Sequence, residues 1–202
     1  MPEIFKRLMF SAVTVFFLSV DLTAQQPDTN LNIFYSMIDS SVTDFISKIP
    51  QSEESIKLDL NLGKEYSVFT NKVIAKTISF GKKITNENNG ESSNVNYIIT
   101  KARVTYGDIY RDGFFGGFYL PRNLSLKGNY TVEDNSTVFK DFNYSYNDTL
   151  KYDDIKNVEN DSYPFTKGEV PPEPFLSSLF EPIVAIGAAA VAVILFFTVR
   201  SE

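Results

Sequence analysis

An uninterrupted apolar run near the C-terminus most constrains how this chain can fold. From Ile183 to Val199 every residue is apolar, small or Thr, and Pro182 and Arg200 bound the run. As a helix the run reaches about 26 Å, close to the hydrocarbon thickness of a bilayer. A helix buried in a globular core is seldom apolar on every face. We therefore expect a transmembrane helix over residues 182–200, with Arg200 on the cytoplasmic side.

Small residues within this run have the spacing of helix–helix contacts. They recur three and four positions apart and include Ala185, Ala188, Ala189 and Ala192. This spacing lets two helices approach closely, so self-association through these alanines is one expectation. The alternative is an alanine-rich helix that contacts only lipid.

The N-terminal end has the layout of a secretory signal. Lys6 and Arg7 precede a mostly apolar run over residues 8–20, and Ala24 offers a small residue for cleavage. The run falls short of the roughly 20 residues that span a bilayer, although an uncleaved first helix is the alternative. The expected segments are a signal peptide (residues 1–24), an extracytoplasmic domain (25–165), a proline-rich linker (166–181) and the transmembrane helix (182–200).

The composition excludes many kinds of chemistry. The chain has no Cys and no His, which removes thiol nucleophiles, histidine-based catalysis, disulfides and the commonest metal ligands. Ser79 and Lys82 have the spacing of penicillin-binding enzymes, but Ser79 should end a helix rather than begin one. No glycine-rich phosphate loop or basic stripe supports nucleotide or nucleic-acid binding. We expect a protein that is not an enzyme and has no cofactor, metal or nucleic-acid partner.

The periodicity of the exported part predicts an α+β fold. Apolar residues recur at helical spacing over residues 31–49 and 65–80, and they alternate with polar residues over 56–62. Strand-like segments follow at 95–110, 118–132 and 137–147. We expect two amphipathic helices packed on one face of a mainly antiparallel sheet.

A charged, aromatic and glycine-rich loop over residues 108–117 is the candidate partner-binding site. The residues that could contact a partner are Asp108, Tyr110, Arg111, Asp112, Phe114 and Phe115. Exposed loops of this kind often carry recognition. In the alternative interpretation, Arg111 pairs with Asp108 or Asp112 and the phenylalanines cover the end of the sheet.

Acidic residues are concentrated in the last part of the exported domain. Residues 28–127 carry 12 Lys/Arg against 11 Asp/Glu, whereas residues 128–181 carry 4 against 11. This acidity indicates a solvated segment, and attraction of a basic partner or loosely bound cations is the alternative. No calcium-binding loop spacing is present.

Six Asn-x-Ser/Thr sequons leave a second cellular context open. They lie at Asn123, Asn129, Asn135, Asn143, Asn147 and Asn160. In a eukaryotic cell they would predict a type I membrane glycoprotein. A disulfide-free exported domain instead favours bacteria, where the sequons arise from the abundance of Asn, Ser and Thr.

The overall plan resembles uncharacterised bacterial envelope proteins. The resemblance rests on the signal peptide, the segments 106–108 (YGD), 113–116 (GFFG) and 162–169 (SYPFTKGE), and the anchor. More distantly, the helix-strand-helix-strand opening is similar to the N-terminal domain of TolB and to CsgG-like periplasmic modules. Element order of this kind implies no activity.

Two hypotheses about function follow. The first is a non-catalytic, membrane-anchored binding or scaffold domain in the periplasm, which engages another envelope protein through an open sheet edge or the 108–117 loop. The second is a solute- or glycan-binding sensor domain with a pocket between helices and sheet.

Overall fold

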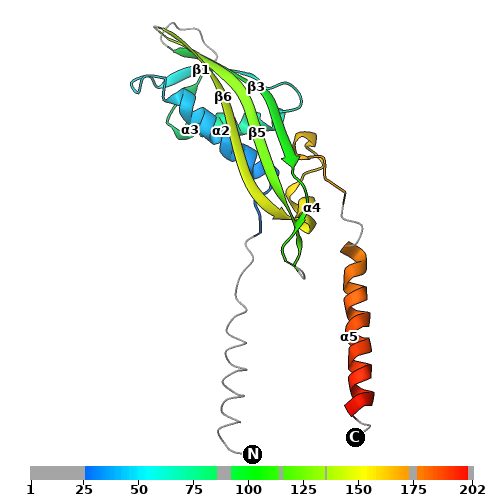
Figure 1. Ribbon diagram of the computed structural model, residues 1–202. Helices are drawn as coiled ribbons and strands as arrows, with labels where there is room; N and C mark the ends of the chain where they lie inside the picture. Colours follow the sequence, from blue (N-terminus) through cyan, green and yellow to red (C-terminus); the bar gives the residue numbers. More distant parts are fainter. Residues whose placement is uncertain (1–25, 86–91, 114–115, 135, 173–176, 200–202) are drawn as a thin grey trace, which may run out of the picture.

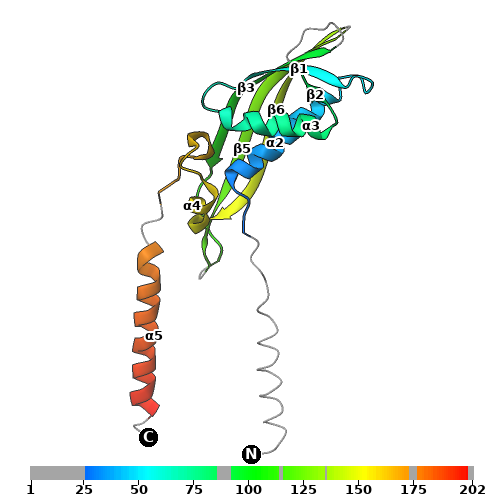
Figure 2. The same ribbon diagram turned by 180° about the vertical axis from the view of Figure 1, so that it is seen from behind.

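Two helices cover one face of a single β-sheet in the computed structural model of this protein (Figure 1). The structure describes residues 26–85, 92–113, 116–134, 136–172 and 177–199. Seen from behind, α2 and α3 lie together across the sheet (Figure 2). The architecture confirms the predicted α+β class.

The elements agree closely with the expected periodic segments. The helices are α2 (Asn30–Ile46), α3 (Thr70–Ser79), α4 (Ile155–Val158) and α5 (Ser177–Val199), with short 3₁₀ turns η1 (Ser67–Phe69), η2 (Tyr152–Asp154) and η3 (Pro164–Thr166). The strands are β1 (Ser55–Asn61), β2 (Lys83–Ile84), β3 (Ser93–Tyr106), β4 (Tyr110–Arg111), β5 (Phe118–Glu133) and β6 (Thr137–Lys151).

The sheet is mixed rather than mainly antiparallel. Its order is β2-β1-β3-β5-β6, and β4 pairs with β5 beyond the end of β3. β1 pairs in parallel with β2 and β3, whereas β3, β5 and β6 are antiparallel. The chain passes from β1 through η1 and α3 to β2, which gives the long crossover connection that parallel strands require. The expected antiparallel arrangement is therefore correct for the β3-β5-β6 part alone.

Helix α2 forms where the sequence predicts it and buries the predicted face. The Thr29 hydroxyl accepts a hydrogen bond from the Asn32 backbone N–H at 3.2 Å, which caps the first turn. Pro50 follows the end of the helix, where it cannot interrupt backbone hydrogen bonds. The apolar residues on the buried face are Ile33, Phe34, Met37, Ile38, Val42 and Phe45.

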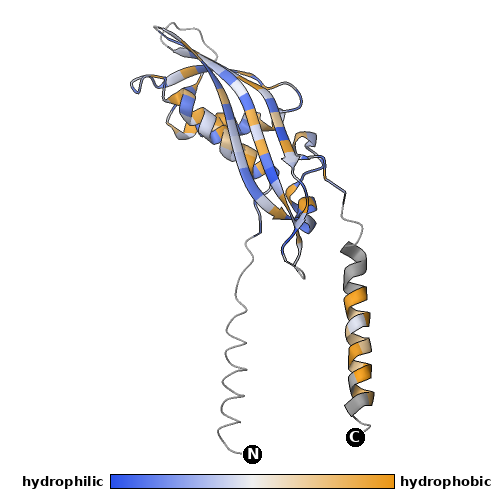
Figure 3. Cartoon of the chain, in the orientation of Figure 1, coloured by the Kyte–Doolittle hydropathy of each residue, from blue (hydrophilic) through white to orange (hydrophobic). Residues whose placement is uncertain are grey.

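The core lies between α2, α3 and the helix-covered face of the sheet. Along β5, alternate residues from Leu120 to Val132 are buried, as period-2 side-chain direction requires. Figure 3 shows this alternation of hydrophilic and hydrophobic residues along β3, β5 and β6. Phe165, from the segment after α4, packs against Phe34 and Phe69 with ring centroids 5.6 and 5.2 Å apart. The segment after α4 thus contributes to the same core.

The opposite face of the sheet, here called the open face, carries polar side chains. Four sequon asparagines lie on it, namely Asn123, Asn129, Asn143 and Asn147, at positions that alternate with the inward-facing ones. Asn123 Nδ2 donates to Asn147 Oδ1 at 2.5 Å across β5 and β6. Asn135 lies outside the described residues. The positions of these asparagines do not test glycosylation, and the glycoprotein alternative stays a prediction.

The expected membrane-related segments lie at the two ends of the chain. The predicted signal peptide falls outside the described residues, and the predicted anchor coincides with helix α5. Across the residues that the structure describes, no helix is long and apolar enough to span a membrane. The structure therefore does not support the predicted transmembrane helix over 182–200, nor does it test self-association through its alanines.

Candidate functional site

The 108–117 loop forms a short hairpin extension, and two of its side chains, Tyr110 and Arg111, contact the start of β5. The ring of Tyr110 stacks on that of Tyr119 with centroids 6.1 Å apart. Arg111 Nε donates to the carbonyl oxygen of Gly116 at 3.0 Å, and its guanidinium lies 5.2 Å from the ring centroid of Phe118. The side chains of Asp108 and Asp112 are exposed, while Phe114 and Phe115 lie outside the described residues. A partner-binding role for this loop stays a prediction.

Strand β6 offers a more extensive surface at the edge of the sheet. It pairs with β5 in one continuous register, from Tyr119 opposite Lys151 to Glu133 opposite Thr137. Within the described parts of the chain, β5 is the only strand paired with β6. The 15 residues of β6 extend over about 50 Å at the usual rise of a strand. Half of their backbone N–H and C=O groups therefore point away from the sheet, along what we call the free edge.

Three of the usual protections of an edge strand are missing from β6. Edge strands are commonly short, kinked by a bulge or interrupted by proline, because unpaired backbone groups recruit other strands. β6 contains neither proline nor glycine, and its register with β5 has no shift. β6 does carry two inward-pointing charges, Lys140 and Asp148, but Asp44 and Arg122 pair with them. The geometry of the free edge is that of a site for strand addition.

Asp44 of α2 holds the first half of β6 against the helix layer. Its carboxylate lies 2.7 Å from Nζ of Lys140 on β6 and accepts a hydrogen bond from the Tyr130 hydroxyl at 2.9 Å. Burial raises the pKa of Asp44, but the hydrogen bonds from Lys140 and Tyr130 and the charges of Lys140 and Lys48 outweigh this effect. The pKa therefore lies below its ordinary value, and the ion pair is charged at neutral pH.

Arg122 holds the second half of β6. Its side chain is fully buried, and Nε and Nη2 donate to the two carboxylate oxygens of Asp148 at 2.8 and 2.5 Å. Nη1 donates to Asn30 Oδ1 at 2.7 Å and to the Asp28 carbonyl at 2.9 Å. A bidentate, charge-assisted pair of this kind fixes geometry strongly. It joins β5, β6 and the start of α2 in one hydrogen-bonded network.

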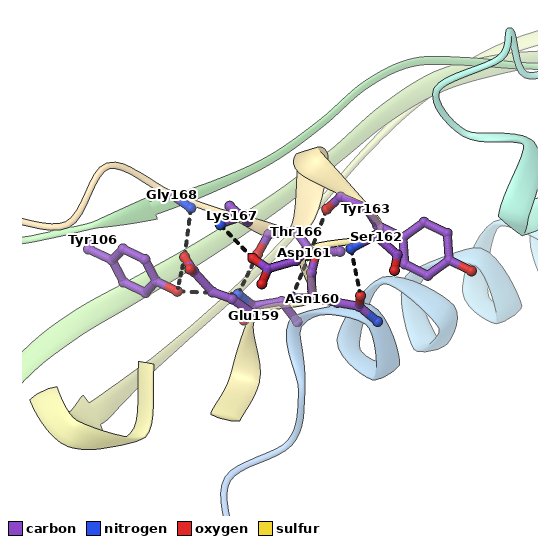
Figure 4. Close-up of polar contacts among 10 residues, drawn as sticks. Tyr106, Glu159, Asn160, Asp161, Ser162, Tyr163, Thr166, Lys167 and Gly168 are labelled. Carbon is purple, nitrogen blue, oxygen red and sulfur yellow. Dashed lines mark hydrogen bonds and ion pairs between the residues drawn. The ribbon is translucent and has the colours of Figure 1, made fainter. Parts of the chain in front are cut away.

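Residues 159–168, here called the C-terminal strap, complete this network. Asn30 Nδ2 donates to the Thr166 carbonyl at 2.8 Å. The Tyr106 hydroxyl donates to Glu159 Oε1 at 3.1 Å, and the same oxygen accepts from the Gly168 N–H at 2.9 Å (Figure 4). Burial and the neighbouring Glu159 charge raise the pKa of Tyr106, so its hydroxyl stays protonated as the donor. The strap, the start of α2 and the end of β6 meet at one end of the sheet (Figures 1 and 2).

A shallow groove runs between the two helices and the strap. It has a volume of about 580 Å³. Its lining combines two tyrosine rings with amide, hydroxyl and ammonium groups, from Tyr35, Ser67, Val68, Asn71, Lys72, Ala75 and Tyr163. Lys72 Nζ lies 2.8 Å from Asp39 Oδ2 and 5.7 Å from the ring centroid of Tyr35, so the lysine is held beside the groove. The sensor hypothesis placed a pocket between helices and sheet, whereas no strand residue in the described part of the chain lines this groove.

Two acidic residues in the last part of the domain are engaged in ion pairs. Asp148 pairs with Arg122, and Asp161 lies 2.6 Å from Lys167. Among the residues that the structure describes, no group of three or more acidic side chains is placed to hold a metal ion.

Sequence reasoning missed Arg122 and Asp148, although Arg122 gave a detectable signal. It occupies an inward position of β5 between Leu120 and Leu124, where every other inward side chain is uncharged. A cation at such a position requires a buried acidic partner. The sequence does not show that Asp148 is this partner, because the pairing depends on the register of β5 with β6.

Comparisons with known proteins give distant structural neighbours only. No protein-family model and no curated protein matches the chain. It is similar to the minor lipoprotein from Acinetobacter baumannii, with 13% identity over 50% of this chain and 67% of that one, at a TM-score of 0.30. It is also similar to the rare lipoprotein B from Shewanella oneidensis, with 15% identity over 72% of this chain and 96% of that one, at a TM-score of 0.32.

These neighbours are bacterial lipoproteins. Likeness at this level carries no argument about what this chain binds. The similarity to TolB and CsgG-like modules stays a prediction.

Proposed function

We propose that this protein is a non-catalytic binding module of the bacterial envelope that takes up an extended segment of another polypeptide along the free edge of β6. The observation that carries the proposal is the length of that edge, with 15 regularly paired residues on one side and no strand among the described residues on the other. A strand added there would satisfy the outward-pointing backbone groups of β6.

The rigidity of β6 supports this role. Asp44 fixes its first half through Lys140, and Arg122 fixes its second half through Asp148. An edge held in one conformation before binding loses little conformational freedom when a partner strand pairs with it. Backbone hydrogen bonds would supply affinity, and the side chains of β6 would select the partner.

We also propose that α5 tethers the module to a membrane. Its described apolar side chains are largely exposed, including Ile186 at 70% and Phe197 at 68%. Neither side chain belongs to the core clusters of the domain. A large exposed apolar surface of this kind needs a cover, and lipid provides one. A chain ending at residue 172 should leave the membrane fraction on carbonate extraction, whereas the full chain should stay in it.

Site-specific photocrosslinking in the native cells tests the binding role. A photoreactive residue would replace Phe139 on β6, which is 61% exposed, and in a control chain Ile78 on α3, which is 55% exposed. The two positions match in exposure and apolar character but differ in distance from the free edge. We expect protein adducts from position 139 and not from position 78.

The outcomes separate the proposal from its alternatives. Adducts of equal yield at both positions would show non-specific contact, and no adduct at position 139 would refute a partner at the β6 edge. Either result overturns the proposal.

The groove between α2, α3 and the strap supports a second candidate, the binding of a solute or glycan. Tyr35 and Tyr163 offer aromatic faces, and Asn71 offers an amide that donates and accepts hydrogen bonds. Replacing Tyr163 with alanine should abolish ligand signals in a saturation-transfer NMR screen of envelope glycans if this candidate is correct. The absence of such signals from the unmodified protein would exclude it.

A further inference from the structure

We propose that the strand which occupies the free edge of β6 is β6 of a second copy of this chain, paired antiparallel about Tyr144. This inference rests on the proposed function, because it names the partner for the same edge. Its basis is the self-complementarity of the β6 sequence. A two-fold symmetric contact uses the same surface on both copies, so one strand must fit itself.

The register follows from the length of the strand. In an antiparallel pair centred on Tyr144, Thr137 lies opposite Lys151 of the second copy, and all 15 residues of β6 find a partner. Any other centre leaves residues at one end of the strand unpaired. The register with the most backbone hydrogen bonds is therefore the one centred on Tyr144.

The same register also matches the side chains on the helix-covered face. Val138 lies opposite Leu150 of the second copy, Phe142 lies opposite Tyr146, and the two Tyr144 rings face each other. Apolar and aromatic cross-strand pairs of this kind stabilise a sheet. Tyr146 is 38% exposed in the single chain although it faces the helix layer, so a neighbouring strand would cover a surface that α2 leaves open.

The charges of β6 are complementary in this register. Lys140 lies opposite Asp148 of the second copy, and the symmetry of the contact makes this pair twice. Lys140 already pairs with Asp44, and Asp148 already pairs with Arg122. Across the contact, the side chains would therefore follow one another as acid, base, acid and base. Moving the centre by one residue, to Ser145, would place Lys140 opposite Leu150 and lose this match.

The open-face side chains are compatible with the same pairing. Asp141 lies opposite Asn147 of the second copy, and Phe139 lies opposite Thr149. No like charges meet anywhere along the 15 positions. Full overlap and charge matching are two separate properties of the strand that select this register, and the apolar residues match in it as well.

Disulfide trapping tests the register directly, because the chain contains no Cys of its own. Tyr144→Cys in the full-length protein in detergent micelles would place two thiols opposite each other, with Cα atoms about 4.5–5.5 Å apart, a distance that a disulfide spans. We expect most of the chain to become a disulfide-linked dimer under a mild oxidant. In the control Thr149→Cys, the two thiols would lie ten positions apart along the strand, about 33 Å, and no dimer should form.

A second variant covers the case in which Tyr144→Cys does not fold. Asp141→Cys/Asn147→Cys replaces two exposed residues on the open face, which the register places opposite each other between copies. No dimer from either variant, or equal dimer from the control, overturns the inference. If photocrosslinking at position 139 then captures a different protein, the proposed function stands without self-pairing. If it captures nothing, both fail.

Discussion

Replacing Arg122 with methionine should be among the most damaging single changes in the domain. Methionine fills a similar volume but removes four hydrogen bonds, two of them to Asp148. Breaking a buried ion pair on one side typically costs about 3–5 kcal/mol. Asp148 is 24% exposed and can regain some water, so we expect a loss of about 3 kcal/mol, at the lower end of that range.

Thermal unfolding of the full-length protein followed by circular dichroism measures this loss. For a domain of this size, about 3 kcal/mol corresponds to a Tm lower by roughly 6–12 °C. Arg122→Met/Asp148→Leu should recover a large part of the loss, because apolar residues of similar volume often replace a buried ion pair at little cost. The control Lys127→Met lies on the same strand but is exposed, and it should change stability by less than about 0.5 kcal/mol. A Tm for Arg122→Met equal to that of Lys127→Met would refute the role given to this network.

Three further predictions concern packing and pH. Phe165→Ala should cost about 3–5 kcal/mol and expose the C-terminal strap to limited proteolysis, because its ring fills the core beside Phe34 and Phe69; unchanged proteolysis would contradict this. Gly128→Ala should lower the free energy of unfolding in urea by about 1–3 kcal/mol, because an added Cβ would meet the Ile98 carbonyl oxygen and the Phe142 ring. Wild-type stability of this variant would contradict such a close approach of β3 and β5 at Gly128. The pKa of Asp44 is lower in the folded state than in the unfolded state. Its charged form therefore contributes fully to folding stability above the ordinary Asp pKa of about 3.9, and this contribution is lost as pH falls through the pKa of the folded state. Asp44→Asn should therefore lose less stability than the wild type between pH 5 and pH 3, and identical pH profiles would contradict the assignment.

The sequence predicted the elements of this fold well because its periodicity is strong. Inward-facing and outward-facing residues alternate over 118–132 and 137–147, and a polar turn separates the two segments. The structure pairs them as β5 and β6 in a hairpin. Helix α2 was equally clear, because its apolar face recurs without interruption from Ile33 to Phe45. These signals are local, so one sequence suffices to detect them.

The arrangement of the strands was less predictable because it depends on contacts distant in sequence. The parallel pairings of β1 with β2 and β3 join strands that are not joined by a hairpin, and the strand-rich second half of the sequence favoured an antiparallel sheet. The free edge of β6 likewise depends on strand order, which no local pattern gives. The loop over 108–117 was identifiable from its residues, whereas the link between Arg122 and Asp148 needed the register of two strands.

Hydrogen exchange along β6, followed by NMR of the full-length protein at high and low concentration, tests the central claim most directly. A strand paired on one side protects only alternate amides, whereas a strand paired on both sides protects nearly all of them. We predict protection of consecutive amides from Val138 to Leu150 at high concentration and alternate protection after dilution. Alternate protection at every concentration, with no partner protein added, would contradict pairing of two copies along the free edge of β6.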